Sequence, residues 1–224
     1  MNAPSVSADL GSQLITLMAA LMLVLQLLLV VENRVLTGIR LYAIQSLFLA
    51  GIAGVVAFFN NAVDVYIVAA LTVLGKVVFL PWLLNRQVRR IQIVQEIEPL
   101  FNAPTAMLVC GGLTLLGYIV ARPFTGLERL GNNTLAIAIT LVLTGFFLMF
   151  NRRKALTQVL ALLTVENGVM LAAIALTTYG MPLVVEFGIF FDVLVAVMIL
   201  GILVYRIRES FASMDTSKLN QLKG

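Results

Sequence analysis

Residues 155–178 read ALTQVLALLTVENGVMLAAIALTT, and residues 183–206 read LVVEFGIFFDVLVAVMILGILVYR. Each segment is long enough to cross the hydrocarbon core of a membrane, which takes about 20 apolar residues. Each carries a carboxylic acid near its middle, Glu166 in the first and Asp192 in the second. An acid at bilayer depth costs about 2.5 to 3.5 kcal/mol on insertion scales. We therefore predict that the two acids form a functional site that faces protein or water.

The composition of the 224 residues restricts the class of protein. Hydrophobic residues make up 61% and charged residues 12%, with a mean hydropathy of +1.03. Too little polar surface remains to cover a water-soluble domain of this size, so we predict an all-α, polytopic membrane protein in contact with the lipid bilayer. The net charge is +4. The basic residues cluster at the ends of apolar segments, which argues against a nucleic-acid partner.

The chain has few side chains that could bind a metal ion or a redox cofactor. The chain has one cysteine, Cys110, and no histidine. An internal disulfide framework and a four-cysteine metal cluster are therefore excluded, and the commonest ligand of haem and zinc is missing. Cys110 is interpreted as a small hydrophobic residue. We expect no catalytic residue, metal ligand or cofactor site in this chain.

Seven apolar segments have the length of a membrane-crossing helix. The predicted spans cover residues 10–31, 38–59, 62–84, 105–121, 134–150, 155–178 and 183–206. Residues 85–104 form the one long polar connection. Its apolar residues recur every three or four positions among arginines and glutamates, which predicts an amphipathic helix on the membrane surface or against a partner. The apolar residues are Val88, Ile91, Val94, Ile97 and Phe101.

The basic residues set the expected orientation. With seven spans, twelve of the fifteen lysines and arginines fall on the side of the C-terminus and two on the side of the N-terminus, while Lys76 lies within the third span. Loops rich in lysine and arginine stay in the cytoplasm. We therefore predict that the N-terminus lies outside and the C-terminus lies in the cytoplasm.

Three ionisable groups from three spans are predicted to share one layer near the membrane midplane. Measured from the cytoplasmic ends at ~1.5 Å per residue, Glu166, Asp192 and Lys76 lie at depths of roughly 18, 21 and 15 Å. Asn167 and Gln45 are expected to support them with hydrogen bonds. Two interpretations stay open: a relay for protons or a small cation, which is the default for intramembrane acids, and a structural ion pair that fixes helix packing.

The last third of the chain resembles the three-helix K subunit of respiratory complex I and the C subunit of multisubunit cation/proton antiporters. The resemblance rests on the basic turn 152–154, the acids Glu166 and Asp192, the glycine-containing apolar run to Arg206, and the short polar tail 207–224. The K subunit has glutamate at both buried positions, so Asp192 departs from its pattern. The resemblance implies a three-helix K-like module over residues 131–224 with a cytoplasmic tail, preceded by a four-helix membrane part over residues 1–130.

Nearly the whole chain resembles hydrogenase-4 component E, a membrane subunit of energy-converting nickel-iron hydrogenases of the formate hydrogenlyase type. The segments that carry this likeness are Tyr42–Leu47, Lys76–Pro81, Glu166–Gly168 and the pair Glu186 and Asp192. The resemblance implies a multi-pass subunit of a prokaryotic inner membrane, seated among antiporter-like subunits, a complex I-type membrane anchor subunit and peripheral hydrogenase subunits. The nickel-iron centre and iron-sulfur clusters would then belong to those partners.

These features predict a non-catalytic subunit of an oxidoreductase complex, with Glu166, Asp192 and Lys76 on a path that couples redox chemistry to the movement of protons or Na+. One alternative is a subunit of a cation/proton antiporter or of another complex I-related assembly. The other alternative is a purely structural membrane subunit whose buried charges only pair with each other.

Overall fold

The computed structural model describes residues 3–60, 63–91, 99–124 and 133–176, and the single positions 195, 198 and 201. Within these ranges the regular structure is helical throughout. The elements are α1 (Ala3–Val31), α2 (Val35–Asn60), α3 (Val63–Thr72), the π-helix η1 (Val73–Phe79), α4 (Leu80–Ile91), α5 (Ala103–Ala121), the short 3-10 helix η2 (Arg122–Phe124), α6 (Thr134–Asn151) and α7 (Ala155–Leu176).

Six of the predicted spans correspond to helices long and apolar enough to cross a membrane: 10–31, 35–59, 65–89, 103–124, 134–151 and 155–176. The all-helical membrane fold is thus confirmed for the described part of the chain. The seventh predicted span, 183–206, lies outside the described residues except at positions 195, 198 and 201. The count of seven, and the orientation derived from it, stay predictions.

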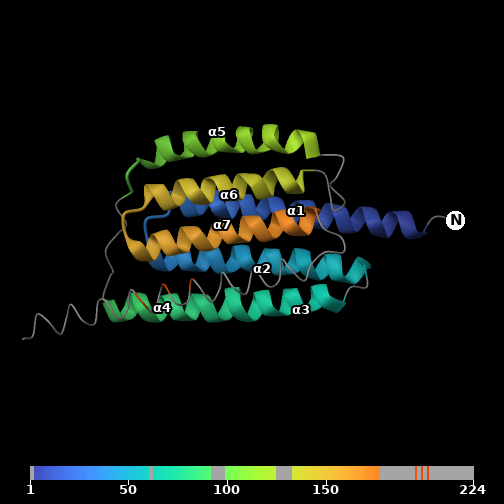
Figure 1. Cartoon of the computed structure of the whole chain (residues 1–224), viewed down its shortest axis with the longest axis horizontal. Coiled ribbons are helices and arrows are strands. Elements are labelled where there is room, and N and C mark those ends of the chain that lie inside the picture. The colour runs from blue at the N-terminus through green and yellow to red at the C-terminus, as the bar shows by residue number, and fades with distance from the viewer. Residues whose placement is uncertain are drawn as a thin grey trace, which may run out of the picture.

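The described helices lie side by side in a bundle (Figure 1). Helix α5 lies at one edge, and α3, η1 and α4 follow one another along the opposite edge, with α6, α1, α7 and α2 between them. Helix α7 lies in the interior of the bundle. In its most apolar stretch of 18 residues 72% is buried, whereas the corresponding share is 17% for α5. The carboxylate of Glu166 is therefore carried by the most enclosed of the described helices.

Two apolar clusters fill the bundle. The first includes Leu29, Val35, Ile39, Leu84, Leu148, Leu160 and Leu163. The second includes Ile15, Met22, Leu49, Ile52, Leu141, Leu171 and Ile174. Along α1, α2 and α7 the two clusters are separated by buried polar residues, namely Gln26, Gln45, Ser46, Thr164, Glu166 and Asn167. A polar layer thus crosses the bundle between two apolar halves.

Glycine at position 168 allows α7 to approach α6 closely beside this layer. A Cβ atom at Gly168 would lie 2.9 Å from the backbone nitrogen of Val142 and 3.0 Å from the Cβ atom of Leu141. Real Cβ atoms hardly ever make such short contacts with backbone, so a larger residue would push the two helices apart. The small residue therefore sets the distance between α6 and the part of α7 that carries Glu166 and Asn167.

The third span extends further than predicted. The third span was expected to end at Leu84 and to be followed by an amphipathic helix on the membrane surface or against a partner, but α4 continues to Ile91. Leu80, Leu84 and Val88 share one face of α4 and are buried, while Arg86 and Arg89 are exposed. The apolar repeat over the start of the connection therefore packs against the bundle, because burial against neighbouring helices offsets the cost of continuing the helix. Residues 92–98 lie outside the described residues.

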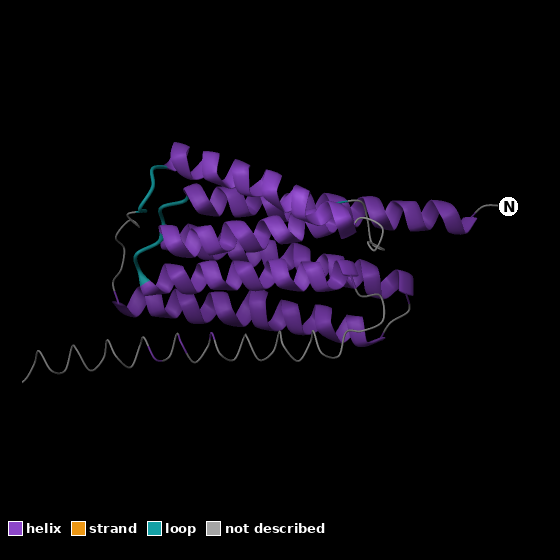
Figure 2. Ribbon diagram, turned by 45° about the horizontal axis from the view of Figure 1, so that its top comes forward, coloured by secondary structure: helices purple, strands orange, loops and turns teal. Residues whose placement is uncertain are grey.

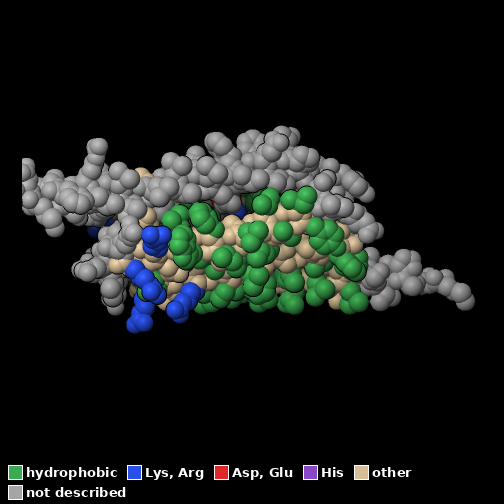
Figure 3. Space-filling view, turned by 90° about the horizontal axis from the view of Figure 1, so that it is seen from below, with side chains coloured by type: hydrophobic (Ala, Val, Ile, Leu, Met, Phe, Trp, Pro, Cys, Tyr) green, Lys and Arg blue, Asp and Glu red, His purple; other side chains and the backbone are tan. Residues whose placement is uncertain are grey.

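The described connections 32–34, 99–102 and 152–154 gather at the end of the bundle opposite the N-terminus (Figure 2). Lysine and arginine side chains collect at that same end, and hydrophobic side chains cover the length of the visible face (Figure 3). This arrangement agrees with the segregation of basic residues in the sequence.

Arg152 has a structural role in this basic end. Its side chain is buried, and its Nη2 atom donates hydrogen bonds to the carbonyl oxygens of Leu29 (3.2 Å), Val30 (3.0 Å) and Glu32 (2.7 Å). The last carbonyls of a helix have no partner within it, so Arg152 satisfies the C-terminal end of α1. Burial lowers the pKa of Arg152, and the nearby Glu32 carboxylate offsets part of this shift. The guanidinium stays protonated because arginine titrates far above neutral pH.

Replacing Arg152 with Gln should destabilise the protein, whereas replacing its exposed neighbour Arg153 with Gln should have little effect. Both changes remove one positive charge from the same turn, but only the first leaves the carbonyls of α1 without their donor. We expect a loss of about 1.5–3 kcal/mol for Arg152→Gln, the usual value of a hydrogen bond to a charged group. Thermal unfolding in detergent measures it, and equal midpoints for the two variants would contradict the role given to Arg152.

Candidate functional site

Lys76 lies in a local change of helix type. The described part of the third span is α-helical up to Thr72, π-helical over Val73–Phe79 and α-helical again from Leu80. The amide of Leu80 donates to the carbonyl of Gly75, five residues back. Short π segments inside α-helices are uncommon and often occur at functional sites. Lys76 is at the middle of this segment and is only 1% exposed.

Lys76 and Glu166 form an ion pair inside the bundle. The Nζ atom of Lys76 lies 2.7 Å from Oε1 of Glu166, and both side chains are almost fully buried. The two residues come from η1 and α7, 90 positions apart in the chain. The structure therefore brings together two of the three ionisable residues that the depth argument placed in one layer. The third, Asp192, lies outside the described residues.

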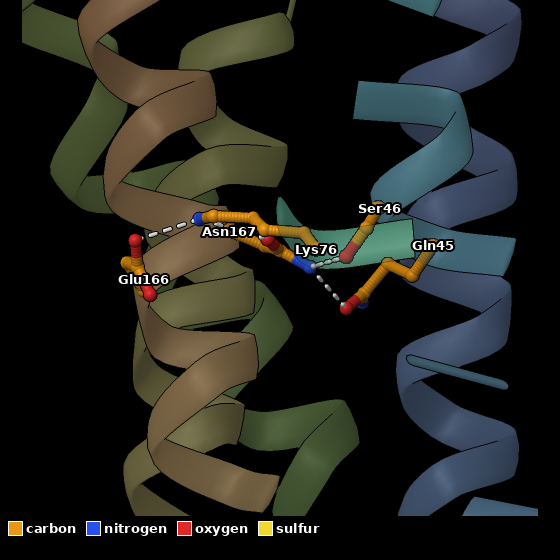
Figure 4. A network of polar contacts seen from close by, with 5 residues as sticks. All are labelled: Gln45, Ser46, Lys76, Glu166 and Asn167. Carbon is orange, nitrogen blue, oxygen red and sulfur yellow. Dashed lines mark hydrogen bonds and ion pairs between the residues drawn. The ribbon is translucent and has the colours of Figure 1, made fainter. Parts of the chain in front are cut away.

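Asn167 joins the ion pair to α2 (Figure 4). Its Oδ1 atom accepts from Nζ of Lys76 at 3.4 Å, and its Nδ2 atom donates to Oε1 of Gln45 at 3.2 Å and to Oγ of Ser46 at 3.0 Å. Asn167, Gln45 and Ser46 are all buried. Asn167 therefore contacts Lys76 directly, and Gln45 is linked to Lys76 through Asn167.

Three members of the polar layer were missed in the sequence, namely Ser46, Gln26 and Thr164. Gln26 on α1 accepts from Nε2 of Gln45 at 3.1 Å, and its own Nε2 donates to the hydroxyl of Thr164 on α7 at 3.3 Å. Both residues are fully buried. Gln26 could have been found in the sequence, because it is an amide side chain within the apolar span 10–31. At ~1.5 Å per residue it lies roughly 12 Å from Arg34 along the helix. Thr164 gave none, because threonine is common in membrane helices and often bonds its own backbone.

The hydrogen bonds run in one direction through this layer. Backbone carbonyls only accept: Met22 O accepts from Nε2 of Gln45 at 3.2 Å, and Ala161 O accepts from the hydroxyl of Thr164 at 2.7 Å. At the other end, the ammonium group of Lys76 only donates. Each amide between them therefore has its oxygen turned toward Lys76. A flipped Asn167 would place an NH2 group against the ammonium, so the network holds a carbonyl oxygen in that position.

This arrangement can hold a charged lysine and a charged carboxylate in a low-dielectric environment. Burying two charges is costly, and the cost is offset only when geometry is good and further hydrogen bonds satisfy the ammonium. The layer thus combines a carboxylic acid, a lysine beside it and a polar frame from four helical segments.

No group of three metal-ligating side chains occurs among the described residues. Cys110 is a free, buried cysteine on α5 and belongs to the first apolar cluster, as expected for a small hydrophobic residue.

The chain is similar to known bacterial proteins along nearly its whole length. It is 36% identical over 204 residues to an uncharacterized protein of Mycobacterium tuberculosis. The matched region covers 90% of this chain and 92% of that relative. It is 28% identical over 220 residues to hydrogenase-4 component E of Escherichia coli K12, covering 96% and 99% of the two chains, and the same figures hold for the protein of that name from Shigella flexneri. No protein-family model and no solved structure matches the chain.

Proposed function

The chain belongs to the hydrogenase-4 component E family, and from this premise we propose that it is a membrane subunit of an energy-converting hydrogenase complex. Within that complex it contributes buried charges to the path that couples redox chemistry to ion movement. The observation that carries this proposal is the buried pair of Lys76 and Glu166 at the centre of a polar layer. Intramembrane acids of this kind mark ion paths by default.

Asp192 completes the proposed path as a second acid from the seventh span. That span also gives the proposed orientation, with the N-terminus outside and the C-terminus in the cytoplasm of a prokaryotic inner membrane. The even number of described spans puts the N-terminus and the end of α7 on the same side, so a seventh span is needed to carry the tail to the other side. Segregation of the basic residues supports this arrangement.

The catalytic centres are assigned to partner subunits. With no histidine and one buried cysteine, this chain offers poor ligands for nickel-iron or iron-sulfur centres. Redox-linked changes in the partners would alter the protonation of Glu166 and Asp192, and charge would then move along the membrane arm. Antiporter-like subunits, a complex I-type anchor subunit and peripheral hydrogenase subunits are the proposed neighbours.

A structural role for the ion pair is the second candidate. The direct contact of 2.7 Å between Lys76 and Glu166, without an intervening group, is the observation that favours it. A pair of this kind could hold η1 against α7 and do nothing else. The two candidates differ in whether Glu166 must exchange a proton.

Purification of the native complex through a tag on the C-terminus tests the membership of this subunit. We expect subunit mass spectrometry to find antiporter-like and hydrogenase subunits, and metal analysis to find nickel with iron. The reason is that a chain without metal ligands depends on partners for its redox chemistry. Antiporter subunits without redox metals would instead assign the chain to a cation/proton antiporter, and a homo-oligomer would contradict both assignments.

A further inference from the structure

We infer that Lys76 makes the Glu166 site selective for protons over Na+, because its tethered ammonium group occupies the position that a bound metal cation would take. The inference rests on the proposed function, in which an ion is exchanged at Glu166, and it names that ion.

The ammonium group of Lys76 lies beside two oxygens that a bound cation could use as ligands. Nζ of Lys76 lies 2.7 Å from a carboxylate oxygen of Glu166 and 3.4 Å from the amide oxygen of Asn167, and these two oxygens come from consecutive residues of α7. A carboxylate and an amide oxygen are the hard ligands that alkali and alkaline-earth cations prefer. The lysine therefore acts as a cation supplied by the protein itself.

The surrounding layer keeps Lys76 in place. The Oδ1 atom of Asn167 is held toward Lys76 because the NH2 group of Asn167 is engaged by Gln45 and Ser46. Lys76 itself is 1% exposed and is anchored in the π segment between two α-helical stretches. Displacing the ammonium would leave a buried charge without its acceptors, so a second cation would have to share the carboxylate with it.

A proton and a sodium ion differ in what they need at such a site. A proton forms one O–H bond with a carboxylate oxygen of Glu166 and takes almost no volume, while Lys76 keeps its bond to Asn167. A sodium ion needs several oxygen ligands to replace its hydration shell, and it would face the positive charge of Lys76 at close range. The site therefore binds a proton and excludes a sodium ion.

The test follows the reactivity of Glu166 in the purified complex. A hydrophobic carbodiimide modifies a buried carboxyl group in its protonated form, and mass spectrometry of the peptide with Glu166 reports the rate. Sodium chloride is exchanged for choline chloride at constant pH and at a constant ionic strength of about 0.1 M, so that screening does not change. An ion that binds the carboxylate slows the modification.

Lys76→Ala and Lys76→Met form the matched pair. Both remove the positive charge, but alanine opens space for a hydrated ion and methionine fills it. We expect no effect of Na+ on labelling in the parent, severalfold slower labelling with Na+ in Lys76→Ala, and a smaller effect in Lys76→Met. Na+ should also raise the thermal stability of Lys76→Ala but not of the parent, since a ligand that binds only the folded state stabilises it.

Protection of Glu166 by Na+ in the parent complex would overturn the inference, whether or not the variants assemble. The inference would also be overturned if Na+ changed neither the rate of Glu166 labelling nor the thermal stability of Lys76→Ala. Either result leaves the proposed function standing. The proposed function fails on a different measurement, namely ion pumping by a Glu166→Gln complex at the parental level.

Discussion

Replacing Glu166 with Gln is expected to abolish proton pumping by the complex while leaving its assembly and its hydrogenase activity in place. Glutamine has nearly the same size and keeps hydrogen-bonding atoms toward Lys76 and the polar layer, but it cannot take up and release a proton. The acidification of inverted membrane vesicles, driven by the redox reaction, should fall to the level seen with a protonophore. Dye-linked hydrogenase activity, measured in the same vesicles, reports the catalytic subunits.

Glu166→Asp is the matched control for this variant. It keeps the carboxylate on a stem shorter by one methylene, so pumping should be reduced but present. Subunit mass spectrometry of the purified complex confirms assembly in each case. A Glu166→Gln complex that assembles and pumps like the parent would refute the relay role of this residue.

Replacing either member of the ion pair alone with leucine is expected to destabilise the subunit far more than replacing both. Lys76→Leu or Glu166→Leu leaves an uncompensated buried charge, which typically costs about 3–5 kcal/mol, whereas the double change to leucine removes both charges and is often close to neutral. Thermal unfolding of the detergent-solubilised subunit gives the three differences. Their non-additivity measures the coupling between the two side chains.

Arg89→Leu provides the control, because Arg89 follows Lys76 in the same span and is exposed. It should have little effect on stability. Pumping by the double variant then separates the two functional candidates. A stable double variant that pumps normally would make the pair structural, and a stable double variant without pumping would support the relay. Single variants as stable as the parent would contradict the burial of charged side chains at this site.

The polar layer also explains how two apolar clusters can belong to one bundle. In lipid, helices gain little from the hydrophobic effect and associate through close packing and hydrogen bonds between helices. The close contact at Gly168 provides tight packing between α6 and α7. The hydrogen-bonded amides from Gln26 to Asn167 connect α1, α2 and α7. The groups that hold the helices together are thus the same groups that orient Lys76 toward Glu166.

The sequence by itself determined the helical fold class, the bounds of six spans to within a few residues, and the similar level of Glu166 and Lys76 along the bundle. These properties follow from local chemistry, because the length of an apolar run and the rise per residue fix where a side chain lies along the membrane normal. The sequence also identified Asn167 and Gln45 as polar residues near the charged ones.

Only the tertiary structure decided which side chains meet within that layer. The sequence of an apolar span does not specify how the helix is rotated about its own axis, because that angle depends on packing between helices. The contact of Lys76 with Glu166, the place of Gln26 in the network and the bonds of Arg152 to α1 all depend on it. The π segment around Lys76 likewise has no signature in the apolar pattern, because a lengthened turn leaves composition and span length unchanged.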